Sequence, residues 1–186
     1  MANVKERAAL ESGLPAGLTD IALASTVPVV IADAAKDDTP LIVVNDAFCD
    51  MAGRDRSEMI GRNCRFLQPA KGAGPAVGRM RAFLVDTTAV EGKFVLPNER
   101  KDGSRFLNLL YLAKFGPVGR SPFVLGSQFD ITTRTIGQLT AYGTELHRNI
   151  ADMNAIISRA GWWAISHHED LAETLDYIAT YRLTEE

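Results

Sequence analysis

Short apolar runs separated by turn-forming residues dominate the middle of the sequence. Residues 27–33 and 41–44 are apolar and rich in β-branched side chains, and the turn residues at 37–40 join them. Two such runs joined by a short turn predict a β-hairpin. Three further runs with the same character lie at residues 92–97, 105–115 and 123–132. Because glycine-containing turns connect them, the pattern predicts a meander that joins the hairpin in an antiparallel sheet of five strands.

Between the hairpin and the later strands, the pattern changes to short helices. Asn45 is suited to cap a helix over residues 47–52, which Gly53 would stop. A second short helical piece begins at Ser57 and ends at Gly61, and a third contains Cys64. Helical spacing then resumes over residues 77–84. This order of strand, strand and helical connector predicts an α+β domain with short helices on one face of the sheet.

Both ends of the chain carry apolar residues at helical spacing. In residues 1–24 we expect a turn of helix over 6–12 and a second short helix with Thr19 as its N-cap. Disordered tails are usually poorer in apolar residues, so we expect this segment to pack on the core or on a partner.

The C-terminal residues 134–186 follow a heptad pattern, which is typical of coiled coils and helix bundles. The apolar positions on three- and four-residue steps are Ile136, Leu139, Gly143, Leu146, Ile150, Met153, Ile157 and Ala160. A bend should follow near Gly161, and a second helix should begin with Ser166 as its N-cap. The long helix could cover the exposed face of the sheet or pair two copies of the chain; the two are compatible, and we favour a homodimer formed through the terminal helices.

Composition and charge exclude several classes of function. The chain has 186 residues, enough for one domain and an extension, and its net charge is −3. The C-terminal segment carries four basic and eight acidic residues, a net charge of −4, whereas a helix that reads DNA should be basic. We therefore expect no nucleic-acid partner. No apolar run is long enough to cross a bilayer, so we expect no membrane partner and a cytoplasmic location. The two cysteines have no CxxC spacing, which argues against a metal site.

The segment from Gly61 to Gln68 carries the strongest chemical signal. Cys64 lies between Asn63 and Arg65, and Gln68 follows four residues later. If the segment is a short α-helix, Cys64 and Gln68 share one face. Such a face suits a polar, anionic, partly aromatic ligand held close to a sulfur. Taken alone, Cys64 would be read as a buried structural cysteine, which is common for this residue type.

This eight-residue segment resembles the signature of the LOV (light-oxygen-voltage) branch of PAS domains, and the phrase Asn45-Asp46-Ala47-Phe48 matches LOV sequences as well. The resemblance runs from about Ser25 to Thr133, so we divide the chain into a cap (1–24), a LOV domain (25–133) and a helical extension (134–186). It implies a PAS/LOV fold and a bound flavin, with FMN favoured over FAD or riboflavin. It also implies that blue light drives a reversible bond between the Cys64 sulfur and a flavin ring carbon.

The same resemblance assigns further residues to the flavin site. The amides of Asn98, Asn108 and Gln128 match the LOV positions that bind the polar edge of the flavin, and Asn63, Gln68 and Leu110 match cofactor-binding positions. Arg65 and Arg81 match the residues that clamp its phosphate; the alternative for each is a solvated surface charge, the commoner place for arginine. Ala32, Leu110 and Arg54 depart from the usual LOV residues Thr, Phe and Tyr, and Pro97 requires an edge strand or a bulge.

By resemblance the chain is a blue-light photoreceptor and not an enzyme. Gln128 would exchange hydrogen bonds when the flavin N5 atom becomes protonated, and the last strand would pass that change to the C-terminal helix. The alternatives are a PAS-type flavin redox sensor and a light-controlled adaptor for a separate kinase or regulator. His147 lies in a segment that loosely resembles a kinase phosphoacceptor box, but an exposed helical histidine is the simpler interpretation.

Overall fold

The structure is a computed structural model that describes residues 13–72, 74–119, 122–132, 135–163 and 165. Its strands are β1 (Val29–Asp33), β2 (Leu41–Val44), β3 (Glu91–Glu99), β4 (Arg105–Pro117), β5 (Phe123–Asp130) and β6 (Trp162–Trp163). Its helices are α2 (Leu18–Ala24), α3 (Asp46–Ala52), α4 (Arg56–Met59), the 3-10 helix η1 (Cys64–Leu67), α5 (Ala76–Val85) and α6 (Ile136–Arg159). The predicted α+β class is confirmed.

The sheet has the strand order β2-β1-β5-β4-β3, and every neighbouring pair is antiparallel. The predicted hairpin and meander are therefore both present, and the meander joins the hairpin by pairing β5 with β1. Pro97 lies in β3, an edge strand, as its missing N–H group requires. β6 is an addition that the sequence pattern did not predict: it pairs with the end of β4 through Gly116 and Pro117.

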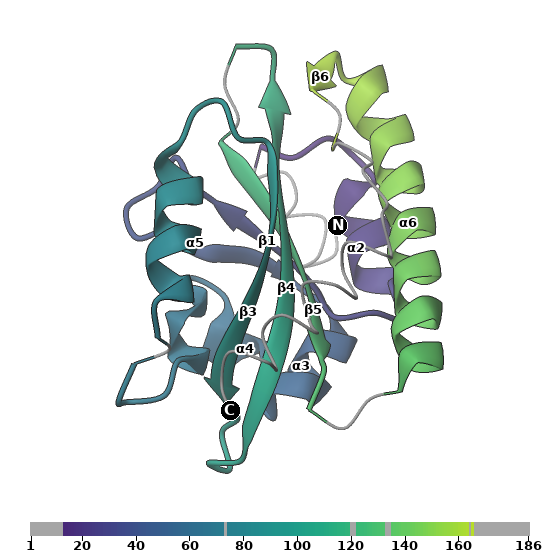
Figure 1. The fold of residues 1–186 in the computed structure, drawn as a ribbon. Coiled ribbons are helices and arrows are strands. Elements are labelled where there is room, and N and C mark those ends of the chain that lie inside the picture. The colour runs from purple at the N-terminus through teal and green to yellow at the C-terminus, as the bar shows by residue number, and fades with distance from the viewer. Residues whose placement is uncertain (1–12, 73, 120–121, 133–134, 164, 166–186) are drawn as a thin grey trace.

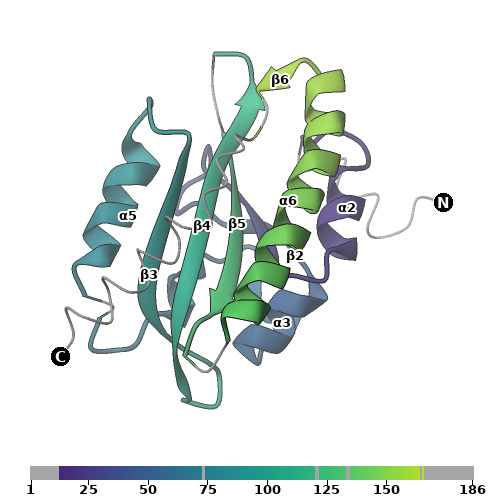
Figure 2. The same cartoon turned by 45° about the vertical axis from the view of Figure 1, so that its right-hand side comes forward.

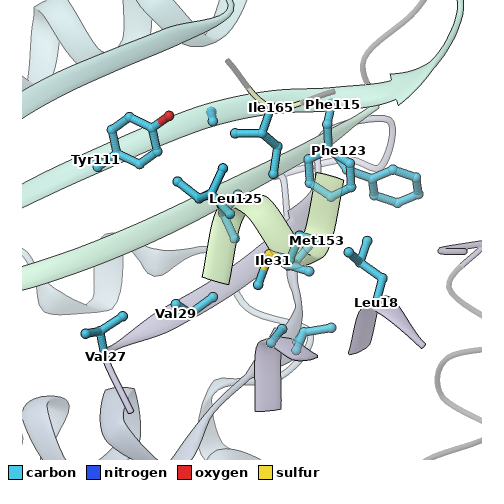
Figure 3. Close-up of a cluster of buried hydrophobic side chains, with 14 of the residues drawn as sticks. Leu18, Val27, Val29, Ile31, Tyr111, Phe115, Phe123, Leu125, Met153 and Ile165 are labelled. Atoms are coloured by element: carbon cyan, nitrogen blue, oxygen red, sulfur yellow. The ribbon is translucent and has the colours of Figure 1, made fainter. Parts of the chain in front are cut away.

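Helices cover both faces of the sheet (Figures 1 and 2). On one face, α2 and α6 lie side by side and pack over a large apolar core that includes Leu18, Leu125 and Met153 (Figure 3). On the other face lie α5 and the α3–α4–η1 connector, each with its own apolar cluster. Side chains alternate along β4, so that Leu109 faces α6 and Leu110 faces α5.

Local sequence fixes the connector between β2 and α3. Asn45 caps α3 by accepting a hydrogen bond from the Phe48 N–H group, and its side chain also bonds Val29 N–H and the carbonyls of Ser25 and Val27. The helix then ends at Gly53, whose φ of 63° is in the left-handed region. The predicted cap and stop of this helix are confirmed.

The N-cap predicted at Thr19 is wrong. Gly17, with a φ of 85°, precedes α2, and Thr19 is a buried residue inside the helix. A side chain at position 17 would come within 3.2 Å of Ile156 in α6, so the chain enters α2 through the one residue that fits this close approach. For residues 13–24, the described part of this segment, packing on the core is confirmed, because Leu18 and Ala22 are fully buried.

Four of the eight heptad residues pack within the chain itself, whereas Ile136 at the start of α6 is 68% exposed. Leu139, Ile150, Met153 and Ile157 are buried in the core shared with α2 and the sheet. The expectation that the helix covers a face of the sheet is therefore confirmed, and pairing between two copies stays a prediction.

The predicted bend after α6 is present. Gly161 turns the chain with a φ of 70° ahead of β6. The helical turn predicted at residues 6–12 and the helix predicted after Ser166 lie outside the described residues. Among the residues described, no helix combines the length and apolar content needed to span a membrane.

Candidate functional site

A cavity lies between η1, α5 and the sheet, with a free volume of about 700 Å³ that includes its opening. Its polar lining consists of Thr39, Asn63, Cys64, Arg65, Gln68, Asn98, Asn108 and Gln128. Its apolar lining consists of Val30, Ala32, Leu41, Leu67, Met80, Leu84, Leu96, Leu110, Leu112, Val124 and Gly126. The cavity thus brings together every residue predicted for the site except Arg81.

Cys64 occupies the first position of η1, in the cavity wall. Asn63 caps this turn by accepting a hydrogen bond from Arg65 N–H at 3.0 Å. The short α-helix considered for this segment is instead a 3-10 turn, and Gln68 has already returned to an extended conformation. Three residues per turn would not align positions 64 and 68, so Cys64 and Gln68 reach the same cavity from a turn and from the extended residue after it.

The Cys64 thiol is neutral at physiological pH. Burial raises its pKa to about 12, while the side chain of Gln128 lowers that pKa to a smaller extent. Low-pKa cysteines occur beside cationic groups and react as thiolates. Cys64 is not of this kind, so any chemistry at this sulfur begins from an S–H group.

Three amides on neighbouring strands form a chain of hydrogen bonds along the cavity wall. Asn98 in β3 donates to the Leu67 carbonyl at 3.1 Å, which ties the sheet to η1. Asn108 in β4 donates to Asn98 Oδ1 and to Gln128 Oε1, both at 2.8 Å. All three side chains are almost completely buried.

Two side-chain atoms of these three amides have no hydrogen-bond partner: the acceptor Asn108 Oδ1 and the donor Gln128 Nε2. A buried polar atom without a partner costs about 1–3 kcal/mol, so it usually has a role. Both side chains line the cavity, one with a free acceptor and the other with a free donor. This wall is complementary to a ligand edge that carries both kinds of group.

The two predicted phosphate-binding arginines are in different situations. Arg65 lines the cavity and forms an ion pair with Asp38, with 2.5 Å between Nη2 and Oδ1. Arg81 is exposed on α5 and is not among the lining residues, so its role stays a prediction. Arg65 is the only charged residue that lines the cavity among those described.

The departures from the LOV pattern lie at or near the site. Ala32 and Leu110 both line the cavity. Arg54 is outside it, with its guanidinium 5.5 Å from the centre of the Phe66 ring. Ala32 therefore places a methyl group where threonine would place a hydroxyl in the wall, whereas Cys64 and the three amides are unchanged.

Sequence reasoning missed two residues that shape the site. Lys114 in β4 donates from Nζ to the carbonyls of Phe83 and Asp86 at the end of α5, and so holds that helix over the cavity. A lysine in a strand is ordinarily read as solvent-facing, so no sequence signal indicated this contact. Asp38, in the loop before β2, contacts two wall residues, and its role depends on a backbone conformation that its sequence does not announce.

The chain is similar to several known proteins. The family model for the PAS domain matches residues 26–133. The chain is 36% identical over 107 residues to a blue-light-activated histidine kinase of Rhizobium johnstonii, covering 57% of this chain and 30% of that protein. It is 30% identical over 132 residues to a blue-light photoreceptor of Listeria monocytogenes, covering 71% of this chain and 49% of the relative. The chain thus spans less than half the length of each of these two relatives.

A solved structure shows the same likeness over a whole domain. The LOV domain of the Erythrobacter litoralis EL346 blue-light-activated histidine kinase is 36% identical, with a TM-score of 0.53, and the match covers 57% of this chain and 97% of that domain. The family model covers more than half of the chain, and the LOV structure is covered almost completely. This chain is therefore a member of the PAS domain family, within its LOV branch.

Proposed function

We propose that the chain is a blue-light photoreceptor that binds a flavin, with FMN as the favoured form, in the cavity beside Cys64. The observation that carries the proposal is a neutral thiol and two unpaired buried amide atoms in the wall of one cavity. The relatives named as blue-light proteins support light as the stimulus.

The wall residues fit a flavin. The ring's polar edge carries both hydrogen-bond donors and acceptors, which Asn108 Oδ1 and Gln128 Nε2 can pair with. The apolar lining, including Leu96 and Leu110, suits the flat faces of the ring. Bound there, the flavin would supply the absorption of blue light.

Cys64 is the residue we propose to react. Its S–H group would supply both the sulfur that bonds to the ring under light and the proton that balances that bond, and the sulfur would take the proton back when the bond breaks in the dark. No external oxidant or reductant is needed. A thiol held neutral by burial carries the required proton with it.

Gln128 is the residue we propose to pass the change to the rest of the molecule. Gln128 would present its amide nitrogen to the ring in the dark and its oxygen once the facing ring atom carries a proton, because an amide can both donate and accept. In the structure that oxygen already accepts a hydrogen bond from Asn108, so turning the Gln128 amide would break this bond and rearrange the hydrogen bonds among the three amides.

A direct contact then connects β5 to α6. Ser127 lies on the opposite face of the strand from Gln128, and it accepts a hydrogen bond from Tyr142 in α6 at 2.8 Å. Both Ser127 Oγ and Gln128 N–H donate to the Pro28 carbonyl at 3.1 Å. A shift of β5 at Gln128 would therefore also move Ser127, which is hydrogen-bonded to α6. We propose that α6 reports the state of the cavity to a homodimer partner or to a separate signalling protein, and that the chain is a sensor rather than an enzyme.

The proposal is tested by absorption spectra of the purified full chain in the dark and under blue light. Wild-type protein should carry a flavin, lose its visible absorption under light and recover it in the dark. Cys64→Ala should keep the flavin and lose the bleaching. Cys49→Ala is the matched control, because Cys49 is the other partly buried cysteine and does not line the cavity; it should behave as wild type. Bleaching that persists in Cys64→Ala would refute the role of this sulfur.

The same sample separates the photoreceptor from a flavin redox sensor. A redox sensor should change its spectrum with a mild reductant in the dark and show no Cys64-dependent response to light. A chain that binds no flavin at all would refute both.

A further inference from the structure

The loop between β1 and β2 reaches the cavity beside Cys64. Residues 34–40 form this loop, and Thr39 contributes to the cavity lining. Asp38, the residue before it, contacts two wall residues of the segment that carries the thiol. Its carboxylate pairs with Arg65 at 2.5 Å, and its carbonyl accepts a hydrogen bond from Asn63 Nδ2 at 2.6 Å.

The backbone of this loop is held in an unusual conformation. Asp38 has a φ of 66° and Thr39 a φ of 48°, and these are the only non-glycine residues with positive φ among those described. Left-handed backbone is uncommon for a β-branched residue such as threonine, and it persists only where surrounding contacts enforce it. The hydrogen bond from Asn63 to the Asp38 carbonyl is such a restraint on the backbone, and it leaves the Asp38 carboxylate within reach of Arg65.

This arrangement changes the charge that a ligand meets. Arg65 is the only charged residue in the described lining, so it alone could give the cavity wall a positive charge. Asp38 compensates that charge, and a ligand phosphate would have to share the guanidinium with a carboxylate of the same sign as itself. The apolar faces and the amide wall would recognise the ring whether or not a phosphate is attached.

We infer that Asp38 is a specificity-determining residue that reduces the preference of this site for a phosphate-bearing flavin over a phosphate-free one. The inference rests on the flavin binding proposed above. Asp38 weakens only the phosphate contribution to affinity, because its carboxylate contacts Arg65 and not the amides of the wall.

The test is a comparison of two ligands on variants of the full chain. Flavin-depleted protein is titrated with FMN and with riboflavin, and flavin fluorescence gives the two dissociation constants. Asp38→Asn keeps the size of the side chain and tolerates positive φ. It should tighten FMN by about two- to fivefold, the range expected when one exposed charge pair is altered, and change riboflavin by less than about twofold. Asp37→Asn, an exposed aspartate in the same loop, should change neither ligand by more than about twofold.

A double variant shows whether the gain passes through Arg65. Arg65→Gln alone should weaken FMN and leave riboflavin unchanged, and adding Asp38→Asn to it should give no further gain for FMN. The inference is overturned if Asp38→Asn weakens both ligands equally, because Asp38 would then only hold the loop. It is also overturned if Asp38→Asn matches Asp37→Asn. Wild-type protein that binds neither flavin would refute the proposed function itself, and the inference with it.

Discussion

The hydrogen bond between Tyr142 in α6 and Ser127 in β5 gives the sharpest test of how the helix is attached to the sheet. The two oxygens are 2.8 Å apart and buried, and Tyr142 also packs against Phe129 with 4.7 Å between ring centres. Ser127→Ala would leave the Tyr142 hydroxyl buried without a partner. Tyr142→Phe would keep the ring, and Ser127 would still donate to the Pro28 carbonyl.

The two substitutions should therefore differ in cost. Losing one buried hydrogen bond costs about 0.5–1.5 kcal/mol, whereas stranding a buried hydroxyl costs about 1–3 kcal/mol. We expect Tyr142→Phe to fall in the lower range and Ser127→Ala in the upper one. The Pro28 carbonyl keeps the Gln128 N–H in either case, so it adds no cost of its own. The double variant should be no less stable than Ser127→Ala alone, because the stranded hydroxyl is gone.

Urea unfolding of the four proteins in the dark, at one saturating FMN concentration, measures these differences. The coupling free energy between the two positions follows from the double-mutant cycle. Strictly additive effects would refute the view that this hydrogen bond attaches α6 to β5. Equal costs for the two single variants would show that the Tyr142 hydroxyl finds another partner.

Three further outcomes follow from the site. Lys114→Met should lower the free energy of unfolding by about 1–3 kcal/mol, because two carbonyls at the end of α5 lose a buried donor, and urea unfolding would show it; full stability would contradict the role of that lysine. Burial raises the Cys64 pKa from 9.0 to about 12, so the thiol's contribution to stability is full below about pH 9 and is lost as pH rises toward 12. The difference in free energy of unfolding between wild type and Cys64→Ala should therefore fall across that interval. The rate of bleaching should stay flat between about pH 6 and pH 9, where the thiol keeps its proton. Gly126→Ala places a methyl group in the cavity wall 3.1 Å from Val30 Cγ2, so flavin affinity should fall by about tenfold, and unchanged affinity would mean that the ring does not approach this strand.

The parts of the fold that follow from local residues were predictable. Apolar runs and turns predicted the five strands, and the Asn45 cap and Gly53 stop predicted α3, because each depends on neighbours within a few positions. Thr19 was misjudged because the start of α2 is fixed by the approach of Ile156, 139 positions from Gly17 along the chain. β6 was missed because two tryptophans carry no pairing signal of their own.

The candidate site was predicted chiefly through resemblance. An asparagine in a strand is by default a solvent-facing residue, and nothing in the residues around Asn98 or Asn108 alone predicts burial. The three-amide wall becomes visible only when β3, β4 and β5 are placed side by side. The contacts of Asp38 could not be predicted at all, since its left-handed conformation is enforced by partners 25 and 27 positions away.

The packing of α6 has a consequence for any association of two copies. Leu139, Ile150 and Met153 are already enclosed by α2 and the sheet, so a dimer built on these residues would first require the helix to leave its own domain. Packing of α6 on its own domain and pairing of α6 with a second copy would then compete for the same apolar residues of the helix. For each protomer, any decrease in the free energy that holds α6 on its own domain would favour association by the same amount. The balance between the two arrangements would then be set inside the domain rather than at its surface.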